Sequence, residues 1–175
     1  ERFRNLYDYA PVGYFEYDLR GNITRVNRTE LKMLGYSAEE MIGQPCWKFI
    51  VDEAAREQIL AKLAGTRPPA VGLERTYRRK DGTTFPVLFE DRLLTDENGH
   101  ITGIRTAIQD ITERKRAEES LRESKEQFRF LVEMSPFGVS LIGRDGRYRY
   151  INPKFESIFG YRLEDIPTGR KWFEK

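Results

Sequence analysis

The stretch GNITRVNRTELKMLGY at residues 21–36 returns in altered form as GRYRYINPKFESIFGY at residues 146–161. Both begin with Gly, reach an Asn after a short run of alternating apolar residues, and close on Gly-Tyr. The two stretches lie 125 residues apart, and the same ungapped offset gives twelve identities over the first fifty positions. Solenoid repeats have periods of about 20 to 50 residues. The longer period here predicts two copies of a whole domain, the second truncated at Lys175.

Composition limits the class of protein. With 39% hydrophobic and 33% charged residues over 175 positions, the chain has the make-up of a globular protein. No apolar run approaches the roughly 18 residues of a membrane span, so we expect no membrane contact in this segment. The single cysteine, Cys46, leaves no disulfide framework and suits the cytoplasm. A net charge of +2 gives no reason to expect nucleic acid, and the basic groups 78–80 and 114–116 are interpreted as solvated faces.

Local signals predict the order of the elements. Asn27 is a good N-cap for a helix that Gly35 ends, and Ser37–Glu40 has the capping-box pattern. Asp81-Gly82 favours a tight hairpin between two apolar-alternating runs. The expected elements are strands 12–18 and 22–26, helices starting near 27, 37 and 52, and strands 73–80, 83–94 and 101–111. This order predicts an α+β fold, a five-stranded antiparallel sheet with helices on one face.

Two motifs now carry a resemblance. The run Tyr77–Pro86, YRRKDGTTFP, combined with Asp110–Lys115, DITERK, resembles a PAS domain with its C-terminal PAC segment. Support comes from Asn27–Tyr36 and Gly43–Trp47, and the resemblance restarts in the second copy. It implies a PAS/PAC domain at 1–112, a linker helix at 113–131, and the N-terminal part of a second PAS domain at 132–175.

The resemblance also implies a function. PAS domains are sensory or scaffolding modules of bacterial signalling proteins, often strung in tandem upstream of a histidine kinase and sometimes of a diguanylate cyclase. We therefore expect a cytoplasmic, homodimeric input module without catalytic residues, which relays a signal to an output domain in the same chain. A kinase output would place the parent protein in a two-component phosphorelay. A ligand-free dimerisation scaffold is the alternative.

The linker is the expected path of the signal. Asp110 and Thr112 are the predicted signal-coupling residues, because an Asp after the last strand could cap the linker helix or tie it to the sheet. An apolar stripe with heptad spacing follows, at Ala117, Leu121, Ser124, Phe128 and Leu131. Two interpretations stay open: a solvated single helix with a thin stripe, or the dimer seam of a parallel coiled coil.

The period-two pattern of the strands predicts which side chains face the helices. The expected interior, and the candidate ligand pocket, consists of Phe15, Tyr17, Leu34, Ile59, Leu63, Tyr77, Val87, Phe89, Ile104, Thr106 and Ile108. This set predicts a mostly filled core, with a small apolar ligand as the competing interpretation. Tyr77 and Thr106 are the only polar groups expected inside.

The residues argue against the usual cofactors. Haem-binding PAS domains take their axial His from the long helix, and residues 52–64 contain none; His100 is expected to be exposed beside a turn. Cys46 aligns with the reactive Cys of flavin-binding relatives, but Pro45 and Trp47 replace the Asn and Arg of that motif. The positions that hydrogen-bond flavin fall on Tyr77, Val87 and Ile108. Neither haem nor flavin fits, no metal cluster is evident, and Cys46 is expected to be a small buried residue.

The second copy should hold strands at 139–142 and 147–151 and a helix at 152–159. Two strands alone are marginal in water. We therefore expect Phe155 and Phe159 to bury against a neighbouring chain.

Overall fold

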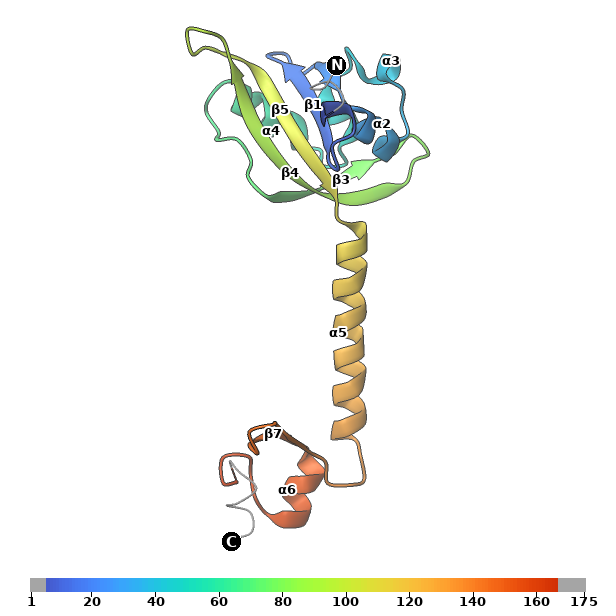
Figure 1. The fold of residues 1–175 in the computed structure, drawn as a ribbon, viewed down its shortest axis with the longest axis vertical. Coiled ribbons are helices and arrows are strands. Elements are labelled where there is room, and N and C mark those ends of the chain that lie inside the picture. Colours follow the sequence, from blue (N-terminus) through green and yellow to red (C-terminus); the bar gives the residue numbers. More distant parts are fainter. Residues whose placement is uncertain (1–5, 167–175) are drawn as a thin grey trace. The chain divides into compact units, whose positions relative to one another are not determined.

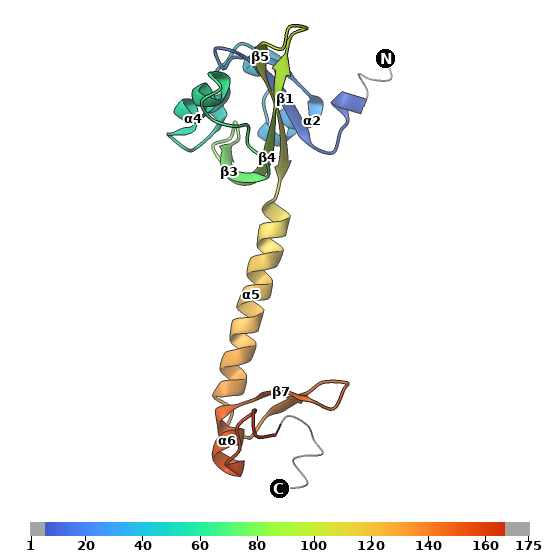
Figure 2. The same cartoon turned by 90° about the vertical axis from the view of Figure 1, so that its left-hand side faces the viewer.

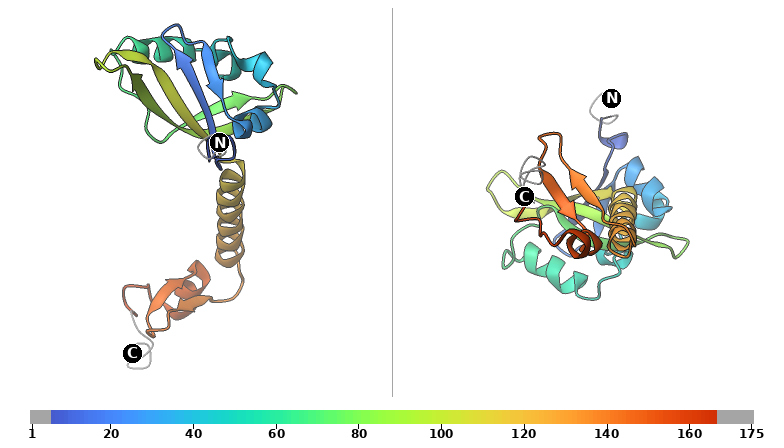
Figure 3. Two further views of the ribbon diagram at one scale, coloured as in Figure 1. Left: turned by 45° about the horizontal axis from the view of Figure 1, so that its top comes forward. Right: turned by 90° about the horizontal axis from the view of Figure 1, so that it is seen from below.

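The computed structural model describes residues 6–166, which form two compact units that divide between Lys115 and Arg116. The first unit contains one antiparallel sheet with the strand order β2-β1-β5-β4-β3 (Figures 1 and 3). Its strands are β1 (Gly13–Asp18), β2 (Ile23–Val26), β3 (Leu73–Arg78), β4 (Thr84–Thr95) and β5 (Ile101–Asp110). The helices between β2 and β3 are α2 (Arg28–Leu34), α3 (Ala38–Met41), η1 (Cys46–Phe49) and α4 (Ala55–Leu63). The predicted fold class is confirmed.

Helix boundaries follow the local chemistry. Asn27 caps α2 by accepting a hydrogen bond from the Glu30 amide, and Gly35 ends it in the left-handed region at φ 78°. The capping box at the start of α3 forms as predicted, with the Glu40 carboxylate accepting from the Ser37 amide at 3.0 Å.

The sheet has two chemically different faces. Alternate residues of β1, β4 and β5 are buried beneath the helices, while the intervening ones face outwards. Figure 2 shows the sheet nearly edge-on, with α4 on one side and the helical turn at residues 6–8 on the other. The core therefore lies between the inner face of the sheet and the helices.

The linker helix α5 runs from Thr112 to Glu133, so it is longer at both ends than the predicted 113–131. Asp110 holds the Thr112 amide at the first end, and the Asn152 side chain binds the Val132 carbonyl at the other. Both contacts come from side chains outside the helix, and the second joins residues twenty positions apart in sequence, which periodicity does not report. Within residues 6–166, no helix is both long and apolar enough to cross a membrane.

The second unit contains β6 (Ser140–Ile142), β7 (Tyr148–Ile151) and α6 (Pro153–Phe159). The prediction that Phe155 buries against a neighbouring chain is wrong. It is buried within its own unit, against Ile151 and Ile166. Phe159 stays 45% exposed, so its burial against another chain remains a prediction.

Candidate functional site

The predicted interior assembles as one core. All eleven candidate residues are buried, with relative exposures of 8% or less, and their side chains come from strands β1, β3, β4 and β5 and from helices α2 and α4. Among Phe15, Cys46, Tyr77 and Phe89 only a cavity of about 10 Å³ remains. That volume is about the minimum for a single water. In this conformation, a larger ligand would require side chains to move.

Sequence reasoning missed a buried polar cluster at the edge of this cavity. Lys62 of α4 forms an ion pair with Asp91 of β4, and both side chains are almost fully withdrawn from solvent. Asp91 also accepts hydrogen bonds from the Thr106 hydroxyl, at 2.7 Å, and from the Ala70 amide, at 3.3 Å. The signal was present in the sequence, because Asp91 continues the inward alternation of Phe85, Val87 and Phe89.

Cys46 is an inert buried thiol, as predicted from its surroundings. Its side chain belongs to the core, and burial raises its pKa to about 12, so the thiol stays protonated at neutral pH. His100 is exposed and lies beside Asp96 in the β4–β5 turn, as expected. Across residues 6–166, no three His, Cys, Asp or Glu side chains are placed to share a metal ion.

The start of α5 is fastened to the sheet through Asp110. One carboxylate oxygen accepts hydrogen bonds from the amide, at 2.8 Å, and the hydroxyl of Thr112. The other oxygen accepts from the Arg79 guanidinium at 2.9 Å. The structure thus brings both predicted coupling residues together, and Asp110 contacts the helix and the sheet at the same time.

Arg79 connects Asp110 to helix α2 and strand β4. Its guanidinium donates a second hydrogen bond, to the Met33 carbonyl of α2, and lies 3.7 Å from the centre of the Phe85 ring. The interpretation of residues 78–80 as a solvated face is therefore wrong for Arg79. Its side chain is only 29% exposed, because the hairpin that Asp81-Gly82 forms folds it over α2 and β4.

Glu74 of β3 provides a second attachment for α5. Its carboxylate pairs with Arg114 at 2.8 Å and with Lys115 at 2.6 Å, so these two residues of the 114–116 group are not simply solvated. The hydrogen bond from Lys115 is the main cause that lowers the pKa of Glu74. We define Glu74, Arg79, Asp110 and Thr112 as the helix junction.

Each copy of the repeat contains the same asparagine clamp. Asn27 accepts hydrogen bonds from the Tyr14 and Glu30 amides and donates to the Tyr7 and Val12 carbonyls, at 2.9 to 3.1 Å. Asn152 makes the same four bonds at the 125-residue offset, to Val139, Phe155, Val132 and Phe137. Because Val132 is in α5, the second clamp attaches the end of the linker helix to the rest of the second unit.

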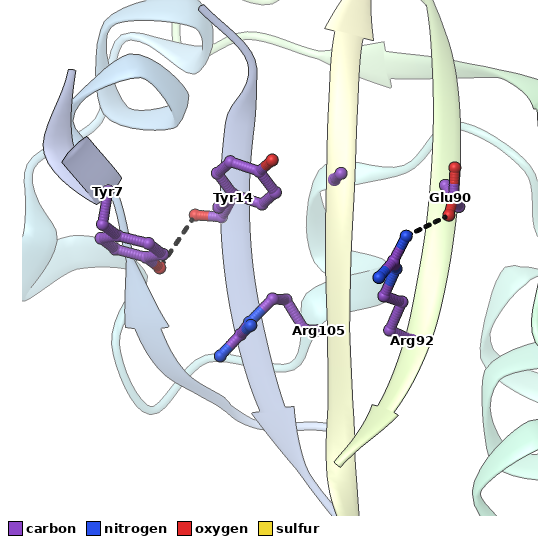
Figure 4. A pocket seen from close by; sticks show the side chains of 6 residues that line it. Tyr7, Tyr14, Glu90, Arg92 and Arg105 are labelled. Atoms are coloured by element: carbon purple, nitrogen blue, oxygen red, sulfur yellow. Dashed lines mark hydrogen bonds and ion pairs between the residues drawn. The ribbon is translucent and has the colours of Figure 1, made fainter. Parts of the chain in front are cut away.

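The outer face of the sheet carries a shallow depression of about 320 Å³. Tyr7 stacks on Tyr14 of β1 above it, while Arg105 of β5 and Arg92 and Glu90 of β4 form its floor (Figure 4). Arg105 is paired with Glu16 at 2.6 Å. The depression is polar, and its charged groups are paired, Arg105 with a residue of the neighbouring strand and Arg92 with Glu90 of its own strand at 3.4 Å.

The predicted seam residues lie on the exposed surface of α5. Leu121, Phe128 and Leu131 are 57%, 61% and 68% exposed, and Ala117 is exposed as well. Within the part of the chain that the structure describes, no residue of α5 is buried. The stripe is thus accessible to a partner, and both interpretations of the linker stay open.

The five-stranded antiparallel sheet is covered by helices on one face, and a long helix follows its last strand; these features define the α+β class of the domain. Residues 11–113 match a family model described as PAS domain, and residues 126–174 match a second model with the same description. The first match alone covers more than half of the chain. The chain belongs to the PAS domain family.

The relatives that the chain resembles carry the names of kinases, a sensor protein and a diguanylate cyclase. The chain is 27% identical over 168 residues to sporulation kinase E of Bacillus subtilis, which covers 95% of this chain and 22% of the kinase. It is 30% identical over 129 residues to the C4-dicarboxylate transport sensor protein DctS of Rhodobacter capsulatus, covering 70% of this chain and 19% of that protein. A probable diguanylate cyclase of Escherichia coli, DgcE, is 24% identical over 139 residues, which are 78% of this chain and 13% of the cyclase. The chain spans about a fifth of the length of the first two relatives.

Among solved structures, the PAS domain of an HTR-like protein from Haloarcula marismortui superposes with a TM-score of 0.53 at 27% identity. The match covers 63% of this chain and 89% of that domain.

Proposed function

We propose that this chain is a cytoplasmic sensory input module of a histidine kinase in a phosphorelay, and that it relays the state of its first PAS domain through α5. The observation that carries the proposal is the position of Asp110. One side chain binds the first residue of the linker helix and the arginine that contacts α2 and β4. A change in the core that moves α2 or β4 therefore reaches the start of α5 directly.

The proposal includes a homodimer in which α5 pairs with its copy along the seam. An exposed apolar stripe on a 22-residue helix supports this pairing, since nothing within residues 6–166 covers the stripe. Through this seam, a shift at the helix junction would rotate the two α5 helices or change their register, and the output domain would respond to that movement. The output domain belongs to the same full-length protein. The lengths of the kinase and sensor-protein relatives support this, because the matches cover only about a fifth of them.

Two alternatives follow from specific observations. The small size of the interior cavity favours a ligand-free dimerisation scaffold, and the likeness to DgcE favours a diguanylate cyclase as the output. A sensor of small apolar molecules differs from the scaffold in native mass spectrometry, where only the sensor carries a co-purified compound.

The test is Asp110→Ala in the full-length parent protein. We expect the response of autophosphorylation to the input to be lost, with a stability cost of only about 1 kcal/mol, because the lost hydrogen bonds are partly exposed. Asp96→Ala is the matched control. Its carboxylate also accepts amide hydrogen bonds within a turn, from Asn98 and His100, but at the β4–β5 hairpin.

The coupling role requires that Asp110→Ala lose the response while the chain unfolds at nearly the wild-type temperature. A normal response in the variant, or equal losses of response in both variants, would restrict Asp110 to a structural role.

A further inference from the structure

Glu30 is a carboxyl group buried without a partner. Its side chain is fully withdrawn from solvent, and neither oxygen makes a hydrogen bond within residues 6–166. A Glu at the third position of a capped helix usually reaches back to the N-cap amide, as Glu40 does in α3. In α2 that amide is already used, because Asn27 donates it to the Tyr14 carbonyl at 2.9 Å.

The internal repeat shows that this position belongs to the core. At the 125-residue offset, Glu30 corresponds to Phe155 and Gly13 to Gly138. The Phe155 side chain lies against Gly138, and the Glu30 carboxyl lies in the same way against Gly13, whose missing side chain also admits Ile108. The fold thus places an apolar ring in one copy where it places an ionisable acid in the other.

A lone carboxylate is far more costly to bury than a neutral carboxylic acid. We propose that Glu30 is a proton-binding site and that the first PAS domain senses pH through it. Protonated Glu30 packs against Gly13 and Ile108; ionised Glu30 is driven out of the core and disturbs the Asn27 clamp. This inference rests on the proposed function, for which it supplies the input signal.

Burial alone raises the pKa of Glu30 from 4.5 to about 8. Because the folded state binds the proton more tightly than the unfolded state, the contribution to stability is complete below pH 4.5. It is lost as the pH rises through about 8. The transition therefore falls at the alkaline edge of the cytoplasmic range.

Few ionisable groups share the surroundings of Glu30. Among the described residues, β1 and β5 lie against the Glu30 carboxyl through Gly13 and Ile108, and neither residue has an ionisable side chain. Tyr77 of β3 is a buried phenol whose pKa is raised first by burial and then by the charge of Glu30. Arg79 contacts the other end of α2, at Met33, and is paired with Asp110.

Two routes lead from Glu30 to the ends of the domain. The Glu30 amide and the Tyr14 amide share the Asn27 side-chain oxygen, and the same side chain holds the Tyr7 and Val12 carbonyls. On the other side Ile108 lies two residues before Asp110, within the same strand. Expulsion of the carboxylate would therefore be felt at the entry of the domain and near the helix junction.

The experiment is an NMR titration of the 175-residue chain from pH 5 to 10, with the glutamate carboxyl carbons labelled. We expect the Glu30 carboxyl carbon to titrate with a midpoint near 8, and the Tyr14 and Glu30 amides to shift with the same midpoint. The protonated fraction should fall from nearly all at pH 6 to about a tenth at pH 9. Glu30→Gln should abolish the amide transition, and Glu57→Gln, an exposed acid of α4, should leave it unchanged.

A Glu30 midpoint below about pH 6 would overturn the proposal, as would an amide transition that persists in Glu30→Gln. Titration of the carboxyl without movement of the Tyr14 amide would overturn the link to the clamp. If Glu30→Gln does not fold, the wild-type carboxyl titration still decides. If the proposed relay through α5 were wrong, Asp110→Ala would keep a normal response in the full-length protein. The titration of Glu30 would not change, so the two proposals fail separately.

Discussion

At the scale of single residues, the first domain buries the charged side chains of Lys62 and Asp91 in positions that usually hold apolar residues. The ion pair of Lys62 and Asp91 sits at the edge of the core, with the Lys62 ammonium 5.3 Å from the Phe89 ring centre. Desolvating two charges offsets much of their attraction, so such a pair adds little stability. Its removal one side at a time is nevertheless costly, because the remaining charge stays buried without a partner.

Lys62→Met should therefore destabilise the first domain by about 3 kcal/mol, and Asp91→Leu by at least as much, since the Thr106 hydroxyl and Ala70 amide lose their acceptor. The double variant should cost less than the sum of the two single changes. Urea unfolding followed by Trp47 fluorescence, in a chain where Phe replaces Trp172, measures all three.

Lys48→Met, an exposed lysine of η1, is the matched control and should stay within about 0.5 kcal/mol of the parent chain. Strictly additive single effects would show that the two side chains do not interact energetically.

Sequence periodicity identified every core residue it named, because alternation and helical spacing report the face on which a side chain lies. It does not report what that side chain meets there. Sequence spacing is enough to place Asp91 and Glu30 on core faces. Only the structure shows that Lys62 pairs with Asp91 and that the Glu30 carboxyl makes no hydrogen bond within residues 6–166. Arg79 was missed as a site residue for the same reason, since its partners are distant in sequence.

At the scale of elements, α5 is fixed at both ends by side chains outside it. The helix junction binds its first turn, and the Asn152 clamp binds the carbonyl of Val132 near its end. Between these points its apolar side chains are exposed and its charges pair along the surface, as in Arg122 with Glu119 and Glu126. Heptad spacing predicted this helix well because its signal is local, whereas its end points depend on the neighbouring domains.

Leu121→Glu tests whether the seam forms a dimer. Two glutamates facing each other in a coiled coil lose apolar burial and repel, so the dimer dissociation constant should rise by about 100-fold or more. Ser120→Glu adds the same charge about a quarter turn away and should have a much smaller effect. Sedimentation velocity across the micromolar range measures both variants. A wild-type chain that is monomeric at high micromolar concentration would rule out the seam.

At the scale of the whole molecule, the two copies of the repeat form an internal comparison. The pairs Tyr17 with Ile23 and Ile142 with Tyr148 have the same register, and both hairpins contain an irregularity at the same place. Sequence alone therefore predicted the local structure of the second copy. It could not predict that Phe155 and Ile166 would form a small core of their own, because that requires the chain after α6 to fold back over the helix.

The two copies should nevertheless differ sharply in stability. In the first, β1 pairs with β5 as well as β2, and Leu34 is completely buried. In the second, β6 pairs with β7 alone among the strands within residues 6–166, and Phe159, the counterpart of Leu34, is about half exposed. A two-stranded sheet with a small core opens at low free energy, whereas a central strand opens only with the whole domain. Hydrogen exchange of the full chain should therefore be faster in β6 and β7 than at the matching positions of β1 and β2, by about two orders of magnitude or more.

The exchange should be measured at a concentration where sedimentation shows a monomer, so that a second copy cannot protect the exposed side chains. Equal protection of both hairpins in that monomer would show that the half-domain folds on its own, and that its exposed apolar residues need no cover.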